Sequence, residues 1–309
     1  MKPSILCSLL MLSFLFFTSC SKEEEKTTFK NKFEININGA NYKSINEDIY
    51  GNENCDNIYV GASYANENGE TLFHIRFQIS KTGHLIEARY EEYATLSKNS
   101  NYINIFLTPN FNPLATFNIS NFHYEPITEE VEFDFDGTVY YADDNSISRN
   151  ISGSMQATSL KNIDCSVPNT GLEYFSSELN LFSFNNSASE YDNGLQLHRF
   201  FSNNGFRVYL SLSKDLWLQN SDEITFDENT SLDRVDFFET IGDLKADHFK
   251  HINEQDWKTY KTSGKIIIEE KYVEKGRNMV RGKLNILVKD NGKIIYNLNG
   301  IEFRTSSFE

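Results

Sequence analysis

Acidic side chains gather in one stretch of the chain, where they could bind a cation. Carboxylate oxygens are the ligands that Ca²⁺ prefers, and this stretch supplies Glu129, Glu130, Glu132, Asp134, Asp136, Asp143 and Asp144. From Glu130 to Asp136, however, the acidic residues alternate strictly with Val131, Phe133 and Phe135, which is typical of a strand with one face in water. The Asp-x-Asp-Gly fragment also lacks the downstream glutamate of an EF-hand loop. The pattern therefore favours a solvated strand face over a metal site.

A histidine pair is the second candidate for metal chemistry. His248 and His251 are three residues apart, with Asp247 and Glu254 nearby, so they would share one face of a helix. No zinc-protease pattern surrounds them and no cysteine joins them, which favours an exposed polar patch. We expect neither a metal nor a cofactor.

Hydrolytic motifs are the next class to consider. The chain has no Gly-x-Ser-x-Gly elbow, no catalytic cysteine context and no phosphate-binding glycine loop. Two carboxylates far apart in the sequence can still meet in one cleft. A carboxylate-based surface hydrolase is therefore the alternative to a non-catalytic binding protein, which is the function that we favour.

Trp217 is the candidate for ligand binding. If the strand that begins at Phe206 runs on in register, Trp217 points outward on the same face as Arg207 and Tyr209. A large aromatic side chain on an outward face usually marks a contact surface, for a glycan or for a protein. The alternative is that a turn at Lys214-Asp215 resets the register, so that Trp217 belongs to the core or covers a domain boundary.

The first twenty residues resemble a bacterial lipoprotein signal peptide. Lys2 supplies a positive start, and Ile5 to Phe17 form an apolar run that is too short to span a bilayer. Phe17-Thr18-Ser19-Cys20 then resembles a lipobox, which implies diacylation of the Cys20 thiol and cleavage before that residue. Two or three acyl chains make a stable membrane anchor. The alternative is an uncleaved anchor in which Cys20 is an ordinary thiol.

The segment after Cys20 resembles the lysine-plus-acidic export tag of Bacteroidota surface lipoproteins. It consists of Ser21 followed by Lys22, Glu23, Glu24 and Glu25. The resemblance implies a lipid-anchored protein of the outer membrane that is exposed on the cell surface. Its partner there would be a glycan, a host protein or a neighbouring outer-membrane component. The alternative is that the acidic segment is only a solvated tether.

Two further cysteines, Cys55 and Cys165, remain in the exported chain. Outside the reducing cytoplasm, such a pair is expected to form a disulfide. The alternative is that both are buried and unpaired, since sequence alone does not show whether their Cα atoms come close enough.

Composition narrows the class of protein. The 309 residues include 29 basic and 44 acidic side chains, with a net charge of −15, which argues against nucleic acid and against binding to an anionic membrane surface. Aromatic residues make up 14% of the chain, a composition that suits packed β structure. The length suits about two ordinary domains.

An internal repeat indicates how these domains divide. Leu72–Lys81 resembles Gly205–Lys214, and Gly137–Tyr141 resembles Gly264–Ile268. Farther on, Arg149–Met155 is echoed by Arg277–Leu284. We therefore predict a duplicated β unit and divide the chain into a signal peptide (1–19), a lipidated acidic tether (20–28), a first β domain (29–167) and a second β domain (168–309).

Alternating apolar and polar residues predict eight strands in the first unit. They are Phe33–Ile37, Ile58–Ser63, Leu72–Ile79, Leu85–Tyr90, Ile103–Leu107, Thr116–Phe122, Val131–Tyr141 and Ile147–Ser159. Turn signals such as Asn38-Gly39 predict antiparallel hairpins. The second unit closes with strands over Lys283–Lys289 and Lys293–Leu298, around Asp290-Asn291-Gly292.

The predicted fold is all-β, with two tandem antiparallel β-sandwich-like domains; lipocalin-like barrels are the alternative. The opening Phe33–Gly39 and the closing hairpin resemble uncharacterised all-β domains of Bacteroidota lipoproteins, which supports fold and location only. Leu232 to Trp257 contains apolar residues every third position, typical of a helix, but Val235–Ile241 also aligns with a predicted strand. The sequence leaves this region undecided.

Overall fold

The computed structural model describes residues 31–307, except for 46–47, 55–56, 98–99, 109–116, 145, 165–167, 178, 185–187, 193–194, 203–204 and 242–253. Within these residues the chain forms β-strands and two 3₁₀ turns, with no α-helix. The described part of the chain also contains no helix that is long and apolar enough to cross a membrane. Several predictions lie outside the described residues and stay predictions: those on Cys20, Lys22–Glu25, Cys55, Cys165, His248 and His251.

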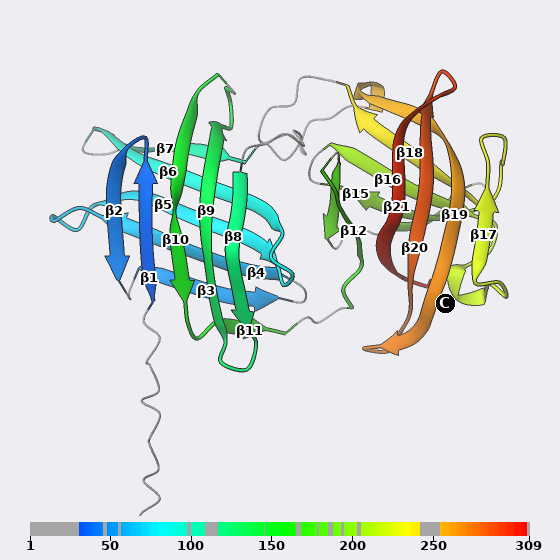
Figure 1. Ribbon diagram of the computed structural model, residues 1–309, viewed down its shortest axis with the longest axis horizontal. Helices are drawn as coiled ribbons and strands as arrows, with labels where there is room; N and C mark the ends of the chain where they lie inside the picture. The colour runs from blue at the N-terminus through cyan, green and yellow to red at the C-terminus, as the bar shows by residue number, and fades with distance from the viewer. Residues whose placement is uncertain are drawn as a thin grey trace, which may run out of the picture. The chain divides into compact units, whose positions relative to one another are not determined.

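The strands from Lys32 to Ile163 form one sheet, in the order β11-β3-β4-β5-β6-β7-β9-β10-β1-β2, with β8 also paired to β9 (Figure 1). Their bounds are β1 (Lys32–Ile37), β2 (Ala40–Ile45), β3 (Ile49–Asn54), β4 (Asn57–Ala65), β5 (Thr71–Ser80), β6 (Leu85–Ser97), β7 (Ser100–Leu107), β8 (Phe117–Glu125), β9 (Glu130–Tyr141), β10 (Ser148–Ala157) and β11 (Lys161–Ile163). We call this the first sheet.

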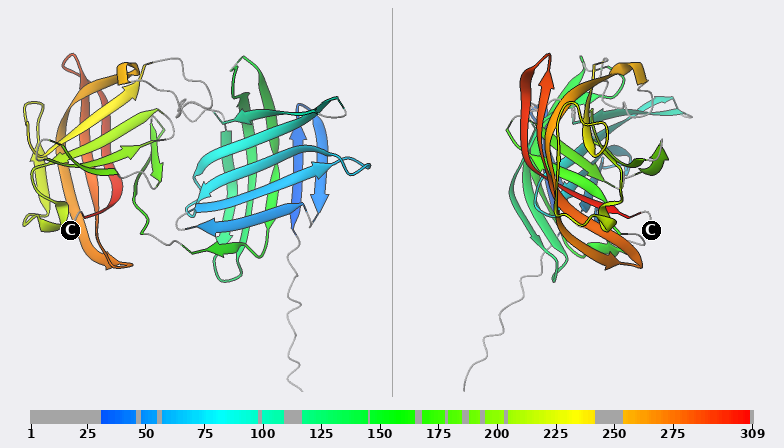
Figure 2. Two further views of the ribbon diagram at one scale, coloured as in Figure 1. Left: turned by 180° about the vertical axis from the view of Figure 1, so that it is seen from behind. Right: turned by 90° about the vertical axis from the view of Figure 1, so that its right-hand side faces the viewer.

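The first sheet folds back on itself at β9. Only Tyr140 and Tyr141 of this strand pair with β7, whereas its earlier residues pair with β8. As a result, β1, β8, β9 and β10 cross in front of β3 to β6, which the view from behind confirms (Figures 1 and 2). The hydrophobic core fills the space between these two layers, and Phe77 and Phe135 meet there with ring centroids 4.7 Å apart.

The acidic stretch lies on β9, as its alternation predicts. Val131, Phe133 and Phe135 are buried in the core, while Glu132 and Asp136 are exposed on the opposite face. No group of three or more His, Cys, Asp or Glu side chains suited to a metal ion occurs among the residues that the structure describes.

The strands from Gly171 to Ser306 form the second sheet, in the order β13-β12-β21-β20-β19-β18-β16-β15-β14, with β17 also paired to β19. Their bounds are β12 (Gly171–Phe175), β13 (Asn180–Phe184), β14 (Ala188–Asp192), β15 (Leu195–Phe201), β16 (Phe206–Leu212), β17 (Glu223–Phe226), β18 (Arg234–Thr240), β19 (Trp257–Glu274), β20 (Arg277–Asp290) and β21 (Lys293–Ser306). The long β19 pairs with β18 through its first residues and with β17 farther on, so this sheet also curls around its own core. The predicted all-β fold class is confirmed, since the two curled sheets are consistent with tandem β-sandwich-like domains. The described strand pairs are antiparallel, except that β11 pairs with β3 in parallel.

Two of the hairpin turns follow from Asn-Gly pairs. Asn38 and Asn291 have φ angles of 48°, and each precedes a glycine that also has a positive φ. Two successive left-handed residues make the type I′ turn, whose twist matches that of the flanking strands.

The region from Leu232 to Trp257, which the sequence left undecided, is resolved in part. Arg234–Thr240 is the strand β18, because Val235 and Phe237 alternate into the core. Residues 242–253 lie outside the described part of the chain.

The repeated segments occupy different places in the two sheets. In the first sheet, β6 and β7 separate β5 from β9, whereas in the second sheet only β18 separates β16 from β19. Each sheet also has one strand outside its main order, and this strand comes at a different point of the chain: β8 follows β7, whereas β17 precedes β18. The duplication and the domain bounds stay predictions.

Candidate functional site

A groove of about 400 Å³ lies on the outer face of the first sheet, across β3, β4, β5 and β6, with Ile163 of β11 also in its lining. Strand alternation decides which side chains reach it. Because Ile58, Val60 and Ala62 point into the core, the intervening residues of β4, which include Tyr59 and Gly61, face outward. The same rule exposes every second residue of β3, β5 and β6 on this face.

One row of polar side chains crosses the groove at right angles to the strands. The register places Asn52 beside Tyr59, Tyr59 beside Gln78, and Gln78 beside Glu87. Gln78 Nε2 donates a hydrogen bond of 2.9 Å to the Tyr59 hydroxyl. Arg76 lies in the next row, and its guanidinium is 4.0 Å from a carboxylate oxygen of Glu87. The row therefore combines donors and acceptors in planar groups.

An aromatic ring forms the end of the groove. Tyr50 lies across Gly61, and a Cβ atom at position 61 would come within 2.5 Å of the Tyr50 hydroxyl. The ring is stacked on that of His74, with centroids 5.5 Å apart and planes 17° from parallel. The Tyr50 hydroxyl lies 2.7 Å from His74 Nε2, and the Ser63 hydroxyl lies 2.9 Å from His74 Nδ1. Tyr50 is nevertheless 44% exposed, so a fixed aromatic ring is presented to solvent.

Partial burial keeps two phenols and one imidazole at the groove uncharged. It raises the pKa of the Tyr50 hydroxyl, and it raises the pKa of Tyr59 with a further contribution from the charge of Glu87. Burial also lowers the pKa of His74 below its usual 6.5. At neutral pH the two phenols and the imidazole are therefore neutral hydrogen-bonding groups.

The arrangement around His74 suits binding better than hydrolysis. Ser63 and His74 are close enough to act as a nucleophile and its base. In a serine hydrolase triad, however, a carboxylate holds the second ring nitrogen of the histidine. Here the Tyr50 hydroxyl lies at that nitrogen, so the contacts of His74 hold an aromatic ring in place.

Trp217 does not lie where a continued strand would place it. Strand β16 ends at Leu212, and the chain then turns into the 3₁₀ helix η1 (Leu216–Leu218). Asp215 begins this helix, because its carboxylate accepts a hydrogen bond of 2.7 Å from the Trp217 amide. Trp217 is half-buried and packs against the second core. The register therefore does not continue beyond Leu212, and the chain takes the turn at Lys214-Asp215 that the sequence offered as the alternative.

Arg207 and Tyr209 do share the outer face of the second sheet, with different neighbours from those predicted. The Arg207 guanidinium lies 3.6 Å from the centroid of the Trp257 ring. The Tyr209 ring lies 4.8 Å from that of Phe238. Sequence reasoning placed neither Phe238 nor Trp257 on this face, although alternation along β18 is the signal that places Phe238 there. Their role in ligand binding stays a prediction.

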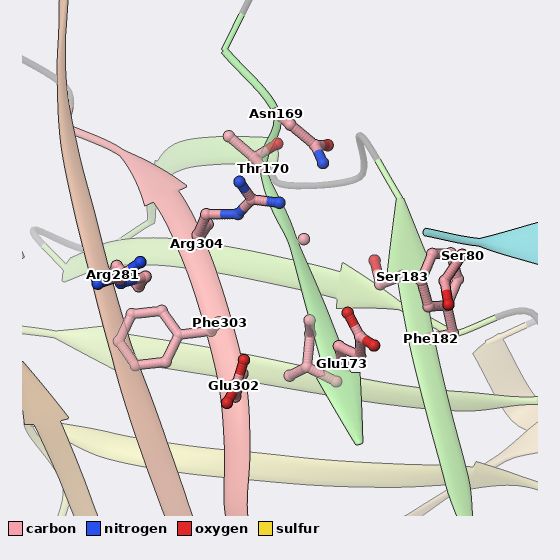
Figure 3. A pocket seen from close by; sticks show the side chains of 12 residues that line it. Ser80, Asn169, Thr170, Glu173, Phe182, Ser183, Arg281, Glu302, Phe303 and Arg304 are labelled. Atoms are coloured by element: carbon pink, nitrogen blue, oxygen red, sulfur yellow. The ribbon is translucent and has the colours of Figure 1, made fainter. Parts of the chain in front are cut away.

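A smaller pocket, of about 170 Å³, lies beside β12 and β21 (Figure 3). Glu173 on β12 and Glu302 on β21 are directly opposite each other in the register, and Arg304 lies farther along β21. Burial raises the pKa of Glu173, and the charge of Glu302 adds to this rise. Burial lowers the pKa of Arg304. The pocket thus places two carboxylates close together. Sequence reasoning allowed for such a pair but did not name its residues.

Comparisons with known proteins do not assign this site. A scan against protein-family models, a search of curated proteins and a search of solved structures each find no significant match to this chain. The functional argument therefore rests on the geometry of the groove.

Proposed function

We propose that this chain is a non-catalytic binding protein whose ligand occupies the groove across β3 to β6. The observation that carries this proposal is the combination of a concave face, a fixed and exposed Tyr50 ring, and a row of planar polar side chains. Binding sites typically combine a hollow, an aromatic contact and a few oriented polar groups. The rigid sheet holds these groups in place before a ligand arrives, which lowers the entropic cost of binding.

The cellular location of the protein is part of the proposal. The lipobox-like sequence before Cys20 and the tag Lys22–Glu25 support a lipid anchor in the outer membrane and exposure on the cell surface. Intact cells treated with protease test this directly. The native protein should be degraded, and a variant with Lys22, Glu23 and Glu24 replaced by alanine should be protected. Protection of both proteins in the outer-membrane fraction would contradict surface exposure.

The groove itself is tested by filling it. Asn52→Trp places a bulky ring at one end of the polar row, and Thr225→Trp makes the same change at an exposed position of the second sheet. Biolayer interferometry of the full chain against oligosaccharides and peptides should reveal a ligand that binds the native protein and the Thr225 variant but not the Asn52 variant. Equal binding to all three proteins, or no binding at all, would contradict the proposal.

A surface hydrolase is the second candidate, and the pocket in Figure 3 is what favours it. Directly opposite residues in a sheet have Cβ atoms about 5 Å apart, so Glu173 and Glu302 can approach the carboxylate separation of about 5 Å in retaining glycosidases. Turnover of aryl glycosides that is lost in both Glu173→Gln and Glu302→Gln would support this candidate. Absence of turnover in the native protein would contradict it.

A further inference from the structure

We infer that the ligand of the groove is a neutral oligosaccharide, with one sugar ring stacked on Tyr50 and its neighbours hydrogen-bonded to the row from Asn52 to Glu87. This inference rests on the proposed function and names the class of ligand. Four properties of the groove carry it: the aromatic ring, the polar row, the length of the row and the balance of charge.

The aromatic ring suits the apolar face of a sugar. A pyranose ring presents C–H groups on its faces and hydroxyls around its edge, so it packs flat against an aromatic side chain. Tyr50 can serve as such a platform because Gly61 leaves room for the ring to lie across the sheet, and His74 holds its hydroxyl. A ring held in this way loses little freedom when the sugar binds. His74 is thus a positioning residue for Tyr50.

The polar row suits the edge of a sugar. Neighbouring hydroxyls each donate and accept hydrogen bonds, and the side chains that match them carry paired donors and acceptors in one plane. Asn52 and Gln78 supply amides, and the Glu87 carboxylate and the Arg76 guanidinium complete the set. Asn52 lies on β3, Arg76 and Gln78 lie on β5, and Glu87 lies on β6, so these polar groups are spread along the groove.

The length of the row suits more than one sugar. Asn52, Tyr59, Gln78 and Glu87 stand on four neighbouring strands, which are about 4.8 Å apart, so the row extends over about 14 Å. A single sugar ring is shorter than this row, so it cannot contact both Asn52 and Glu87. The groove therefore fits a short oligosaccharide laid across the strands.

The charge balance selects against anionic sugars. The charged side chains that line the groove, Arg76 and Glu87, have opposite signs and lie 4.0 Å apart. The whole chain carries a net charge of −15, which repels a polyanion at long range.

The position of the groove selects against an added peptide strand. Such a strand needs an open sheet edge, whereas β3, β4, β5 and β6 are paired on both sides. A ligand in this groove must therefore be recognised through side chains.

Isothermal titration calorimetry on the full chain tests the inference. The probes are neutral gluco-, manno- and galacto-oligosaccharides of one to six units, oligogalacturonates, and uncharged octapeptides. We expect one neutral series to bind, with a trisaccharide at least about tenfold tighter than the monosaccharide. Tyr50→Ala should weaken this binding about tenfold or more, and Tyr50→Phe, which keeps the ring, should weaken it less. His74→Ala should also weaken binding, because it removes the contact that holds the Tyr50 hydroxyl. NMR of this variant should show a more mobile Tyr50 ring.

The outcomes separate this inference from the proposed function. An oligogalacturonate or a peptide that binds the native protein and is lost with Asn52→Trp would overturn the sugar class and leave the groove as a binding site. If the Asn52→Trp variant still binds every ligand that the native protein binds, both the sugar class and the groove as a binding site are overturned. Unchanged affinity for a neutral oligosaccharide in a folded Tyr50→Ala protein would overturn stacking. Native-like circular dichroism of each variant shows that the protein is folded.

Discussion

His198 offers a quantitative check on the packing of the second sheet. Its side chain is fully buried, and Nδ1 lies 2.7 Å from the Thr305 hydroxyl. Burial lowers the pKa of this imidazole from 6.5 to about 4, opposed in part by the negative charge of Asp215. The native state therefore keeps the ring neutral at a pH where the unfolded chain has already bound a proton.

This difference makes the protein less stable in mild acid. The unfolded state binds more protons between pH 6.5 and pH 4, so the free energy of unfolding falls as the pH falls through this range. The contribution of the neutral ring is fully present above pH 6.5. From the two pKa values, His198 alone should account for a loss of about 2 kcal/mol between pH 7 and pH 5.

Urea unfolding of the native protein and of His198→Asn at both pH values measures the effect. The asparagine keeps a polar atom near Thr305 but does not titrate, so the native protein should lose about 2 kcal/mol more than the variant. Other titrating groups contribute equally to both proteins and cancel. Equal losses, or an NMR titration that gives His198 a pKa near 6.5, would refute the buried neutral ring.

Three further predictions concern the sheets and can be checked by urea unfolding. Gly282→Ala should lower the free energy of unfolding by about 2 kcal/mol, because its Cβ would collide with the Ile267 carbonyl; an unchanged value would contradict this packing. Arg149 makes two hydrogen bonds to Glu92, of 2.6 and 3.0 Å, so a double-mutant cycle with Arg149→Met and Glu92→Gln should give a coupling of about 1 kcal/mol rather than zero. Asn291→Val should cost about 1 kcal/mol, because a branched side chain tolerates a φ of 48° poorly, while Asn291→Gly should cost less.

Alternation predicted the strands because it is a local property of the chain. Each of the eight segments predicted for the first half overlaps a strand, β9 with its buried phenylalanines most clearly. The missed strands β2, β3 and β11 are short and rich in polar residues, and pairing with neighbours is what orders them. The sequence left both readings of Trp217 open for a similar reason, since the Asp215 cap ends an alternation that the sequence continues.

The groove was beyond the reach of sequence because it depends on contacts across strands. Tyr59 and Gln78 are distant in sequence and meet only through the register of β4 and β5. Tyr50 becomes a platform only because Gly61 lies opposite it and His74 lies one row farther on. Neither residue forms a motif by itself, so the sequence contains no local signal for this site.

The most direct test of the binding site is an NMR titration of the ¹⁵N-labelled full chain with the tightest neutral oligosaccharide. The account predicts that amide shifts concentrate on β3 to β6, around Asn52, Tyr59 and Gln78, while amides near Arg207 on the second sheet stay unchanged. Shifts that concentrate on the second sheet, or no saturable shifts at all, would contradict the account.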